Sequence, residues 1–506
     1  RIIDNSEKSY LDKMSRLPDG EWSDRTYIEA CRPGDRRTHR VMLGLRKEGN
    51  KLIFNNDGSA PQEGAMNATY SGWRGSVMVA VNELLCWDQY FACGGALRNI
   101  EFDPTPGTLN CADFPSSVST APIQATEISL YPAYNVISKM IYPDPVMRKD
   151  IMCIGGTSQW PATLFRGIDQ WGEKYGYLLI DPIGGAIGAF TMADGINTGG
   201  QARTPICQLP NVEHTEQNFP ILFLYRKELS DSGGAGKYRG GLSAESCFIP
   251  HNTEFVTQDT LSSGNAIPTS PGLMGGYPST TNAYTFVKDS NIFDCMALSQ
   301  MPNDTDELLG NSVTLQLREQ NFTQDPKDVY AVRWSGGGGF GDPFDRAPED
   351  IEDDLESLAI TENSAETLYG AILGKDGHVD IERTREHRAK IRKSRVTEIK
   401  KSNRKGQLLS ENSHSINIMR DDTGTYWACA KCDFELGDIS ENYKEHCVTE
   451  NQSIAVSNPL IGDEARFIDN AVEFRQFYCC QCGCLLDNEI AIAEDPLLHD
   501  SRHQLS

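Results

Sequence analysis

The sequence lacks both a long apolar run and a basic charge balance. Its most apolar stretch, residues 177–192, is interrupted by Asp181, Pro182 and glycines, whereas a membrane-spanning helix needs about 20 consecutive apolar residues. Lys and Arg number 47 against 71 Asp and Glu, a formal net charge of -24. A nucleic-acid binder usually carries a basic face. We therefore expect a soluble, cytoplasmic protein that binds neither membrane nor nucleic acid.

The sequence also lacks a nucleotide-binding motif and a disulfide framework. The run Gly336–Gly339 has no strand–turn–helix context with a following acidic residue, and no Walker lysine-serine step occurs. We interpret the run as a turn or a close backbone approach in a β structure. Eight of the 15 cysteines are scattered before residue 429 and seven lie in the last 78 residues, which is typical of a reducing compartment with a local metal site.

Two Cys-x-x-Cys steps dominate the C-terminal part of the chain. They are formed by Cys429 with Cys432 and by Cys479 with Cys482. Each step brings two thiolates within reach of one metal, and four soft ligands favour zinc over magnesium or calcium. Four unrelated core cysteines are a poorer explanation of this spacing. The sequence therefore predicts a closed, structural zinc site that stabilises a small lobe without activating water.

Neighbouring residues leave alternatives for the fourth ligand. Cys480 and Cys484 could each complete the site in a different register, and Cys447 lies in the insertion between the two steps. His446 could also be a ligand, although an isolated histidine is more often a surface or core residue.

The remainder of the chain predicts an α+β fold with a large β-rich body, flanking helices and a small zinc-ribbon-like domain at the C-terminus. We place the body at residues 1–345, an acidic and then basic helical segment at 346–405, and the zinc-binding domain at 406–506, with 403–414 as linker. The patterns that support these bounds are a hairpin at 40–54, helices at 76–85, 125–139, 348–356 and 383–405, and glycine-rich strands over 151–248.

The chain begins with Arg1 rather than methionine, inside a helical pattern. Tyr10, Leu11, Met14 and Leu17 share one face of this helix. We expect a separate polypeptide, or another fragment of a cleaved precursor, to dock against residues 1–100 and to cover this apolar face.

The C-terminal part of the chain resembles the small zinc-bearing gamma subunit of acetone carboxylase. The resemblance rests on the two Cys-x-x-Cys steps and on three further strings, namely DISENYKEHCV at 438–448, RQFYC at 475–479 and LHD at 498–500. It covers about residues 420–500.

The body resembles the C-terminal two-thirds of hydantoinase B-type subunits, a family that includes the alpha subunits of acetone and acetophenone carboxylases. The matching strings are NNDGSAPQEGAMN at 55–67, residues 205–220, DSGGAGKYRGG at 231–241 and GGGGFGDP at 336–343, with residues 369–380 as the family's end. Such subunits carry a further N-terminal region, which in the carboxylases holds the His, Asp and Glu ligands of a catalytic metal. No ligand of that metal is assigned to this chain.

These resemblances imply a subunit of an ATP-dependent ketone carboxylase, which adds bicarbonate to a small ketone to give a 3-oxo acid. They imply a hetero-oligomer in which a hydantoinase A-like subunit uses ATP, and a polypeptide with the missing N-terminal region holds a second divalent metal. The alternatives are a subunit of an ATP-dependent hydantoinase or oxoprolinase-type amide hydrolase, and a non-catalytic assembly subunit.

Catalytic residues are not assigned by the sequence. Glu213, His214 and Glu216 are candidates because a histidine flanked by carboxylates can serve as an acid or base near neutral pH. A polar loop with satisfied hydrogen bonds is the interpretation we favour. His39, within the basic stretch 36–40, could meet phosphate or bicarbonate, but we expect a solvated residue at the start of a strand.

Overall fold

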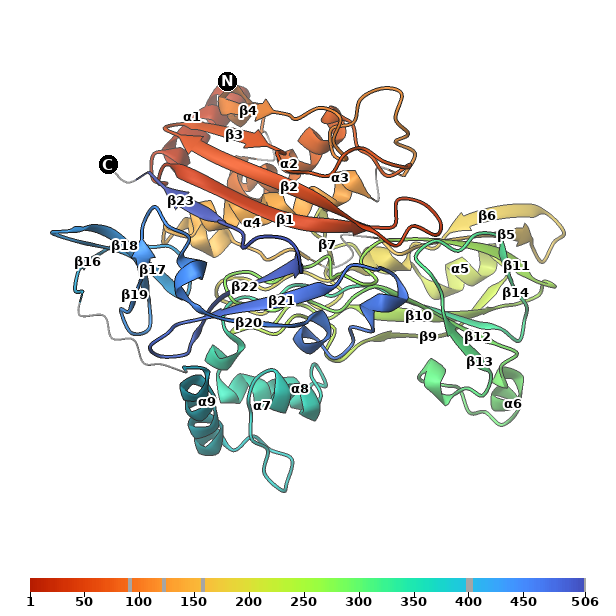
Figure 1. Cartoon of the computed structure of the whole chain (residues 1–506). Coiled ribbons are helices and arrows are strands. Elements are labelled where there is room, and N and C mark those ends of the chain that lie inside the picture. Colours follow the sequence, from red (N-terminus) through yellow and green to blue (C-terminus); the bar gives the residue numbers. More distant parts are fainter. Residues whose placement is uncertain (90–92, 121–123, 156–159, 397–403, 505–506) are drawn as a thin grey trace.

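A computed structural model describes residues 1–89, 93–120, 124–155, 160–396 and 404–504. Figure 1 shows an N-terminal sheet with helices against it, a second pair of sheets, a group of helices on the opposite side, and a C-terminal segment that runs between these parts. The expected α+β class with a β-rich body is confirmed.

The N-terminal sheet has the strand order β23-β1-β2-β3-β4. Its strands are β1 Gly20–Glu29, β2 Thr38–Glu48, β3 Lys51–Asn55, β4 Ile100–Asp103 and β23 Ser501–His503. The expected hairpin is β2 and β3, which turn at Gly49 with its φ of 56°. The helices of this part are α1 Ile2–Met14, α2 Tyr70–Leu85, α3 Ala125–Ile128 and α4 Leu130–Ile141.

The apolar face of α1 is covered by the chain itself. Tyr10 is 1% exposed, Met14 0% and Leu17 6%, and all three join the core formed by α2, α4 and the sheet. Leu11 packs against the same core. The expectation that this face needs a partner's surface is therefore wrong, because the hydrophobic core of the N-terminal part already buries these side chains.

Two helix boundaries differ from the sequence patterns. Helix α2 begins at Tyr70, six residues before the expected start at Ser76, because the Thr69 side chain caps it by accepting the Gly72 N–H at 3.3 Å. The helix expected over 125–139 is divided at Ser129 into α3 and α4.

Two further sheets pack face to face, with strand orders β13-β12-β15-β10-β9 and β14-β11-β5-β6. Phe165, Phe248 and Tyr330 lie in the aromatic core between them. The strands are β5 Ala162–Ile168, β6 Lys174–Leu178, β9 Ile221–Glu228, β10 Ala244–Pro250, β11 Val256–Leu261, β12 Ala283–Lys288, β13 Asn311–Thr314, β14 Phe322–Gln324 and β15 Val329–Arg333. Shorter elements nearby are β7 Gly200–Gln201, β8 Thr204–Pro205, α5 Val212–Asn218 and α6 Ile292–Ala297.

The glycine-rich segments cross one another between these sheets and the N-terminal part. The Gly234 N–H donates to the Gly337 carbonyl at 2.8 Å, and the Gly337 N–H donates to the Gly241 carbonyl at 3.0 Å. A Cβ added to Gly240 would lie 1.8 Å from the Gly337 oxygen. The glycines of 336–339 therefore serve close backbone approach, as the sequence indicated.

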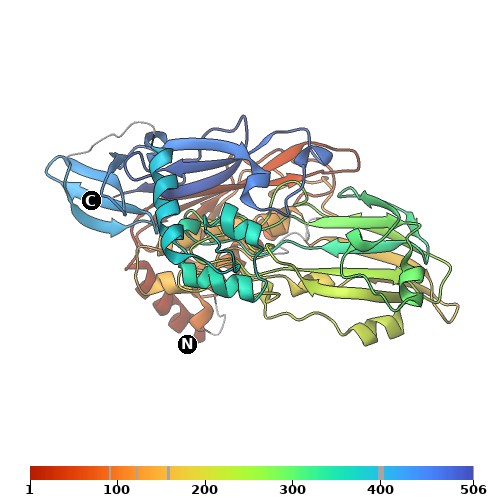
Figure 2. The same cartoon turned by 90° about the horizontal axis from the view of Figure 1, so that it is seen from below.

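Three helices follow the β body: α7 Pro348–Glu356, α8 Glu362–Thr367 and α9 Ile381–Arg395. Figure 2 shows them together beside the C-terminal segment. The acidic helix agrees with its expected bounds. The basic helix was expected to reach Lys405 but ends at Arg395, and residues 397–403 of that prediction lie outside the described residues.

The C-terminal segment, called the tail below, comprises residues 404–504. It forms a sheet in the order β16-β17-β18-β19 and another in the order β20-β21-β22. Its elements are β16 Gln407–Glu411, β17 Ile416–Asp421, β18 Gly424–Cys429, β19 Glu435–Asp438, the 3-10 turn η8 Tyr443–His446, β20 Val448–Ser453, β21 Val472–Tyr478 and β22 Leu485–Ile492. Part of the expected linker is thus the strand β16.

The tail returns to the N-terminal sheet at its end. Strand β23 pairs antiparallel with β1, Gly20 opposite His503 and Trp22 opposite Ser501. Figure 1 shows β23 beside β1. Among the residues that the structure describes, no helix combines the length and the apolar character required to cross a membrane.

Candidate metal centre and its attachment to the body

The four predicted zinc ligands lie at the ends of two strands of the tail. Cys429 is the last residue of β18, and Cys479 directly follows β21. Cys432 and Cys482 each come three residues later in a tight turn, so the two sheets of the tail meet at the cysteines. The four sulfur atoms lie within 4.8 Å of one another.

The two turns have the same backbone pattern. The Lys431 N–H points to Cys429 Sγ at 3.4 Å, and the Gln481 N–H points to Cys479 Sγ at the same distance. Each turn closes through a residue with positive φ, Asp433 at 56° in the first and Gly483 at 67° in the second. Backbone N–H groups directed at sulfur stabilise the thiolate form of cysteine. Both turns therefore favour the form of cysteine that binds a metal.

The sulfur spacings fit a tetrahedral ion. Cys429 and Cys482 are 3.7 Å apart and Cys432 and Cys479 are 3.6 Å apart. A tetrahedron with metal–sulfur bonds of about 2.3 Å has edges of about 3.8 Å. The arrangement is therefore suited to a structural metal held by four thiolates.

Of the neighbouring cysteines, Cys484 is the nearest competitor. Its sulfur lies 3.5 Å from that of Cys429 and 3.3 Å from that of Cys482. Cys480 instead donates to the His446 carbonyl at 3.1 Å, and Cys447 donates to the Tyr443 carbonyl at 3.2 Å. Burial raises the pKa of the Cys447 thiol well above its ordinary value.

Two histidines considered from the sequence lie elsewhere. His446 Nε2 contacts Glu441 at 3.1 Å at the surface and is not in the cysteine cluster. His39 is only 5% exposed, so the expectation of a solvated residue is wrong. The alternation of β2 turns His39 inward together with Val41 and Leu43.

The candidate acid/base residues form the short helix α5. Glu213 and His214 are exposed. The His214 N–H is capped by Asn211 at 2.9 Å, and Glu216 Oε1 accepts the Phe223 N–H at 2.8 Å. These contacts are the locally satisfied hydrogen bonds that we favoured, although they occur in a helix rather than a loop.

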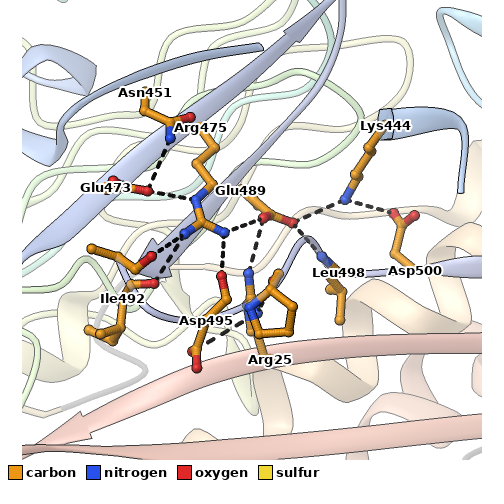
Figure 3. A network of polar contacts seen from close by, with 12 residues as sticks. Arg25, Lys444, Asn451, Glu473, Arg475, Glu489, Ile492, Asp495, Leu498 and Asp500 are labelled. Atoms are coloured by element: carbon orange, nitrogen blue, oxygen red, sulfur yellow. Dashed lines mark hydrogen bonds and ion pairs between the residues drawn. The ribbon is translucent and has the colours of Figure 1, made fainter. Parts of the chain in front are cut away.

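A buried network of charged side chains attaches the tail to the body (Figure 3). Glu489 of β22 lies at its centre and has three cationic neighbours. Arg25 Nη2 of β1 is 3.0 Å away, Arg475 Nη1 of β21 is 3.3 Å away, and Lys444 Nζ of η8 is 3.3 Å away. All four side chains are at most 7% exposed.

The network continues through Asp500, which binds Lys139 of α4 and lies 3.7 Å from Lys444. Burial alone would raise the pKa of Asp500, but Lys139 and Lys444 hold it well below its usual value. Burial alone would also lower the pKa of Lys139, but Asp500, Asp487 and Asp24 raise it. Both groups are therefore charged at neutral pH, and they connect the body to the tail.

Beside this network, the junction encloses a cavity of about 50 Å³. Its polar lining comes from both parts of the chain, with Asp24, Asn135 and Lys139 from the body and Lys444 and Asp487 from the tail. This volume is sufficient for a few water molecules. Lys444, Arg475 and Asp500 belong to the sequence strings on which the resemblance of the tail to the gamma subunit rests. These strings therefore contribute to the contact between tail and body, as well as to the region of the cysteines.

Two known families match separate parts of the chain. Residues 1–343, about two-thirds of the chain, match the family described as hydantoinase B/oxoprolinase. The chain belongs to the hydantoinase B/oxoprolinase family. Residues 407–506 match the acetone carboxylase gamma subunit, so a member of this family here carries a gamma-type tail.

Individual relatives are carboxylase subunits. The chain is 22% identical over 385 residues to the acetophenone carboxylase delta subunit of Aromatoleum aromaticum. The matched region covers 73% of this chain and 55% of that protein. It is 30% identical over 247 residues to the acetone carboxylase alpha subunit of Xanthobacter autotrophicus, covering 46% of the chain and 32% of that protein. The chain thus spans about half the length of these relatives or less.

Solved structures support the fold. A nucleotide-free acetone carboxylase structure superposes with a TM-score of 0.68 at 21% identity, covering 78% of this chain and 55% of the other. The ATP-dependent caprolactamase from Pseudomonas jessenii superposes with a TM-score of 0.63 at 17% identity, covering 76% and 63%.

Proposed function

We propose that this chain is a subunit of an ATP-dependent ketone carboxylase complex that adds bicarbonate to a small ketone and gives a 3-oxo acid. One observation carries the proposal: a hydantoinase B-type body and an acetone carboxylase gamma-type tail occur in one polypeptide. The buried contact between Arg25 and Glu489 joins them as a single unit. Relatives of both parts are named as carboxylase subunits.

We further propose that the metal of the tail is zinc and that its role is structural. Four thiols, two N–H···S turns and sulfur spacings near 3.7 Å support this choice. A site with four protein sulfurs has no open position for substrate. The ketone and bicarbonate are therefore expected to react elsewhere in the complex.

The ATP-using step belongs, in this proposal, to a hydantoinase A-like partner subunit. A polypeptide equivalent to the part of the relatives that the chain does not span holds the second divalent metal. The sequence of this chain contains neither a Walker lysine-serine step nor a Rossmann fingerprint, which supports an obligate hetero-oligomer.

The test is co-expression with a hydantoinase A-type polypeptide and a polypeptide that carries the N-terminal region of the relatives, followed by purification on a tag placed on this chain. The complex should incorporate labelled bicarbonate into an acid product only when both ATP and ketone are present, and this chain alone should hydrolyse no ATP. ATP hydrolysis by the isolated chain that depends on ketone would contradict the proposal.

The same assay should also be run with a cyclic amide in place of the ketone, to test the alternative of an amide hydrolase. This alternative is included because the fold also resembles that of the ATP-dependent caprolactamase. Lactam-dependent ATP hydrolysis without bicarbonate incorporation would identify an amide hydrolase instead. If the other polypeptides, expressed without this chain, fixed bicarbonate at the same rate but no longer purified as one complex, the role of this chain would be that of an assembly subunit.

A further inference from the structure

The connection between β1 and β2 gathers a second set of metal-binding side chains. Cys31 follows β1, Asp35 lies in the turn, and His39 is the second residue of β2. All three side chains are buried, with 1% of Cys31, 3% of the Asp35 side chain and 5% of His39 exposed. None of them belongs to the cysteine cluster of the tail.

The Cys31 sulfur and a His39 ring nitrogen both approach one carboxylate oxygen of Asp35. Cys31 Sγ lies 2.7 Å from Asp35 Oδ2, and His39 Nε2 lies 3.0 Å from the same oxygen. Sulfur, nitrogen and oxygen all lie within 4.8 Å of one another. The same oxygen also accepts the Cys31 N–H at 3.0 Å. Thiolate, imidazole and carboxylate are the three ligand types that zinc takes in proteins.

A second layer of charged side chains orients these donors. The other ring nitrogen of His39, Nδ1, faces Glu63 Oε2 at 3.9 Å. Arg37 donates to Asp35 Oδ1 at 3.0 Å and also binds Glu63. Metal-binding histidines usually place their second nitrogen toward a carboxylate, which fixes the ring. Asp35 and His39 are thus both held from outside the cluster.

An arginine with unused donors lies against the same turn. Arg318 Nη1 donates to the Cys31 carbonyl at 3.2 Å. Its Nε and Nη2 are buried and make no hydrogen bond within the part of the chain that the structure describes. Buried donors without a partner indicate a missing acceptor, and an anion bound beside Cys31 would supply one.

We propose that Cys31, Asp35 and His39 bind a divalent transition-metal ion, with zinc the best fit to this mixed donor set. The three protein ligands leave a fourth position for water or a small anion. Binding converts the Cys31 thiol to a metal-bound thiolate and releases its proton to solvent. This inference is independent of the proposed carboxylase function, since it concerns this chain alone.

The decisive experiment counts zinc in the purified 506-residue chain after loading with zinc and dialysis against zinc-free buffer. We expect about two zinc ions per chain, since each ligand set holds one. X-ray absorption at the zinc edge should then show nitrogen or oxygen ligands at about 2.0–2.1 Å beside sulfur at about 2.3 Å. A count of about one with sulfur ligands alone would overturn the proposal, even if no variant folds.

Variants assign the second ion to its ligands. Cys31→Ala and His39→Gln should each lose about one zinc per chain and leave the tail's ion in place. Cys86→Ser is the matched control, because Cys86 is a free cysteine that is also 1% exposed, and it should keep both ions. The melting temperature of His39→Gln shows whether this variant is folded. If it is folded and binds as much zinc as Cys86→Ser, the cluster is only a hydrogen-bonded turn.

Discussion

Arg25 of β1 donates to Glu489 of β22 at 3.0 Å across a sequence separation of 464 residues. Both side chains are almost completely buried, at 4% and 7% exposure. A charge pair in such a place is strongly destabilising when only one partner is removed, since the other charge stays buried and unpaired. The attachment of the tail therefore depends on these side chains as a set.

The first prediction concerns Glu489→Gln. The substitution keeps the shape but leaves Arg25, Arg475 and Lys444 without their shared counter-charge. We expect the free energy of unfolding in urea to fall by about 3–5 kcal/mol. Glu441→Gln is the control, because Glu441 pairs with His446 at 51% exposure and should change stability by less than about 1 kcal/mol. Equal effects of the two variants would contradict the role of the network.

The second prediction concerns Cys432→Ser. Loss of one ligand should release the tail's metal, measured as about one zinc fewer per chain. Because β21 and β22 share a core with Tyr27 and Tyr277 of the body, we expect proteolysis to increase first in β16–β19 and later at this shared core. Retention of the ion by the folded variant would show that Cys484 replaces Cys432 as the fourth ligand.

The third prediction is a dependence on pH through His503. This side chain of β23 lies between Trp22 of the body and Trp427 of the tail, with ring centroids 5.6 and 5.5 Å away. Burial lowers the pKa of His503 from 6.5 to about 4. As the pH falls below 6.5, His503 becomes protonated in the unfolded chain before it does so in the folded protein. The free energy of unfolding therefore decreases as the pH falls from 6.5 toward 4. Urea midpoints at pH 7.5 and 5.5 should differ less in His503→Gln than in the wild type.

The fourth prediction compares two glycines. Gly240→Ala places a Cβ 1.8 Å from the Gly337 oxygen, where neither backbone segment can move without breaking the crossing. We expect little folded protein from this variant. Gly75→Ala, within helix α2 and with nothing within 4 Å of the added Cβ, should fold normally and gain about 0.5–1 kcal/mol. Soluble yield and melting temperature provide the comparison.

Local patterns in the sequence were sufficient for the hairpin β2–β3, the acidic helix α7 and the four cysteines of the tail. Each depends on neighbours within a few residues, namely alternation in the hairpin, a proline followed by acidic residues in the first turn of α7, or a Cys-x-x-Cys step. His39 shows the limit of such patterns, because Arg37 and Arg40 beside it suggested solvent. The alternation of β2 places His39 on the same buried face as Val41 and Leu43, so the hairpin pattern was the better guide and the charged neighbours were misleading.

The buried network could not be predicted for a related reason. Arg25, Lys139 and Glu489 are ordinary charged residues in their local sequence, and their burial results from contacts between segments more than 300 positions apart. The strings with Lys444, Arg475 and Asp500 were noticed through resemblance alone. Their common location at the junction required the tertiary structure.

The pairing of β23 with β1 has a consequence for biosynthesis. On the ribosome Gly20 emerges 483 residues before His503, its partner in the sheet. At about 5–20 residues per second, this strand waits roughly 25 to 100 s for its neighbour. Throughout that interval the outer edge of β1 presents unpaired backbone groups, the kind of edge that recruits other chains. The nascent polypeptide is therefore exposed to misassembly at β1 until β23 has been translated and has paired with it.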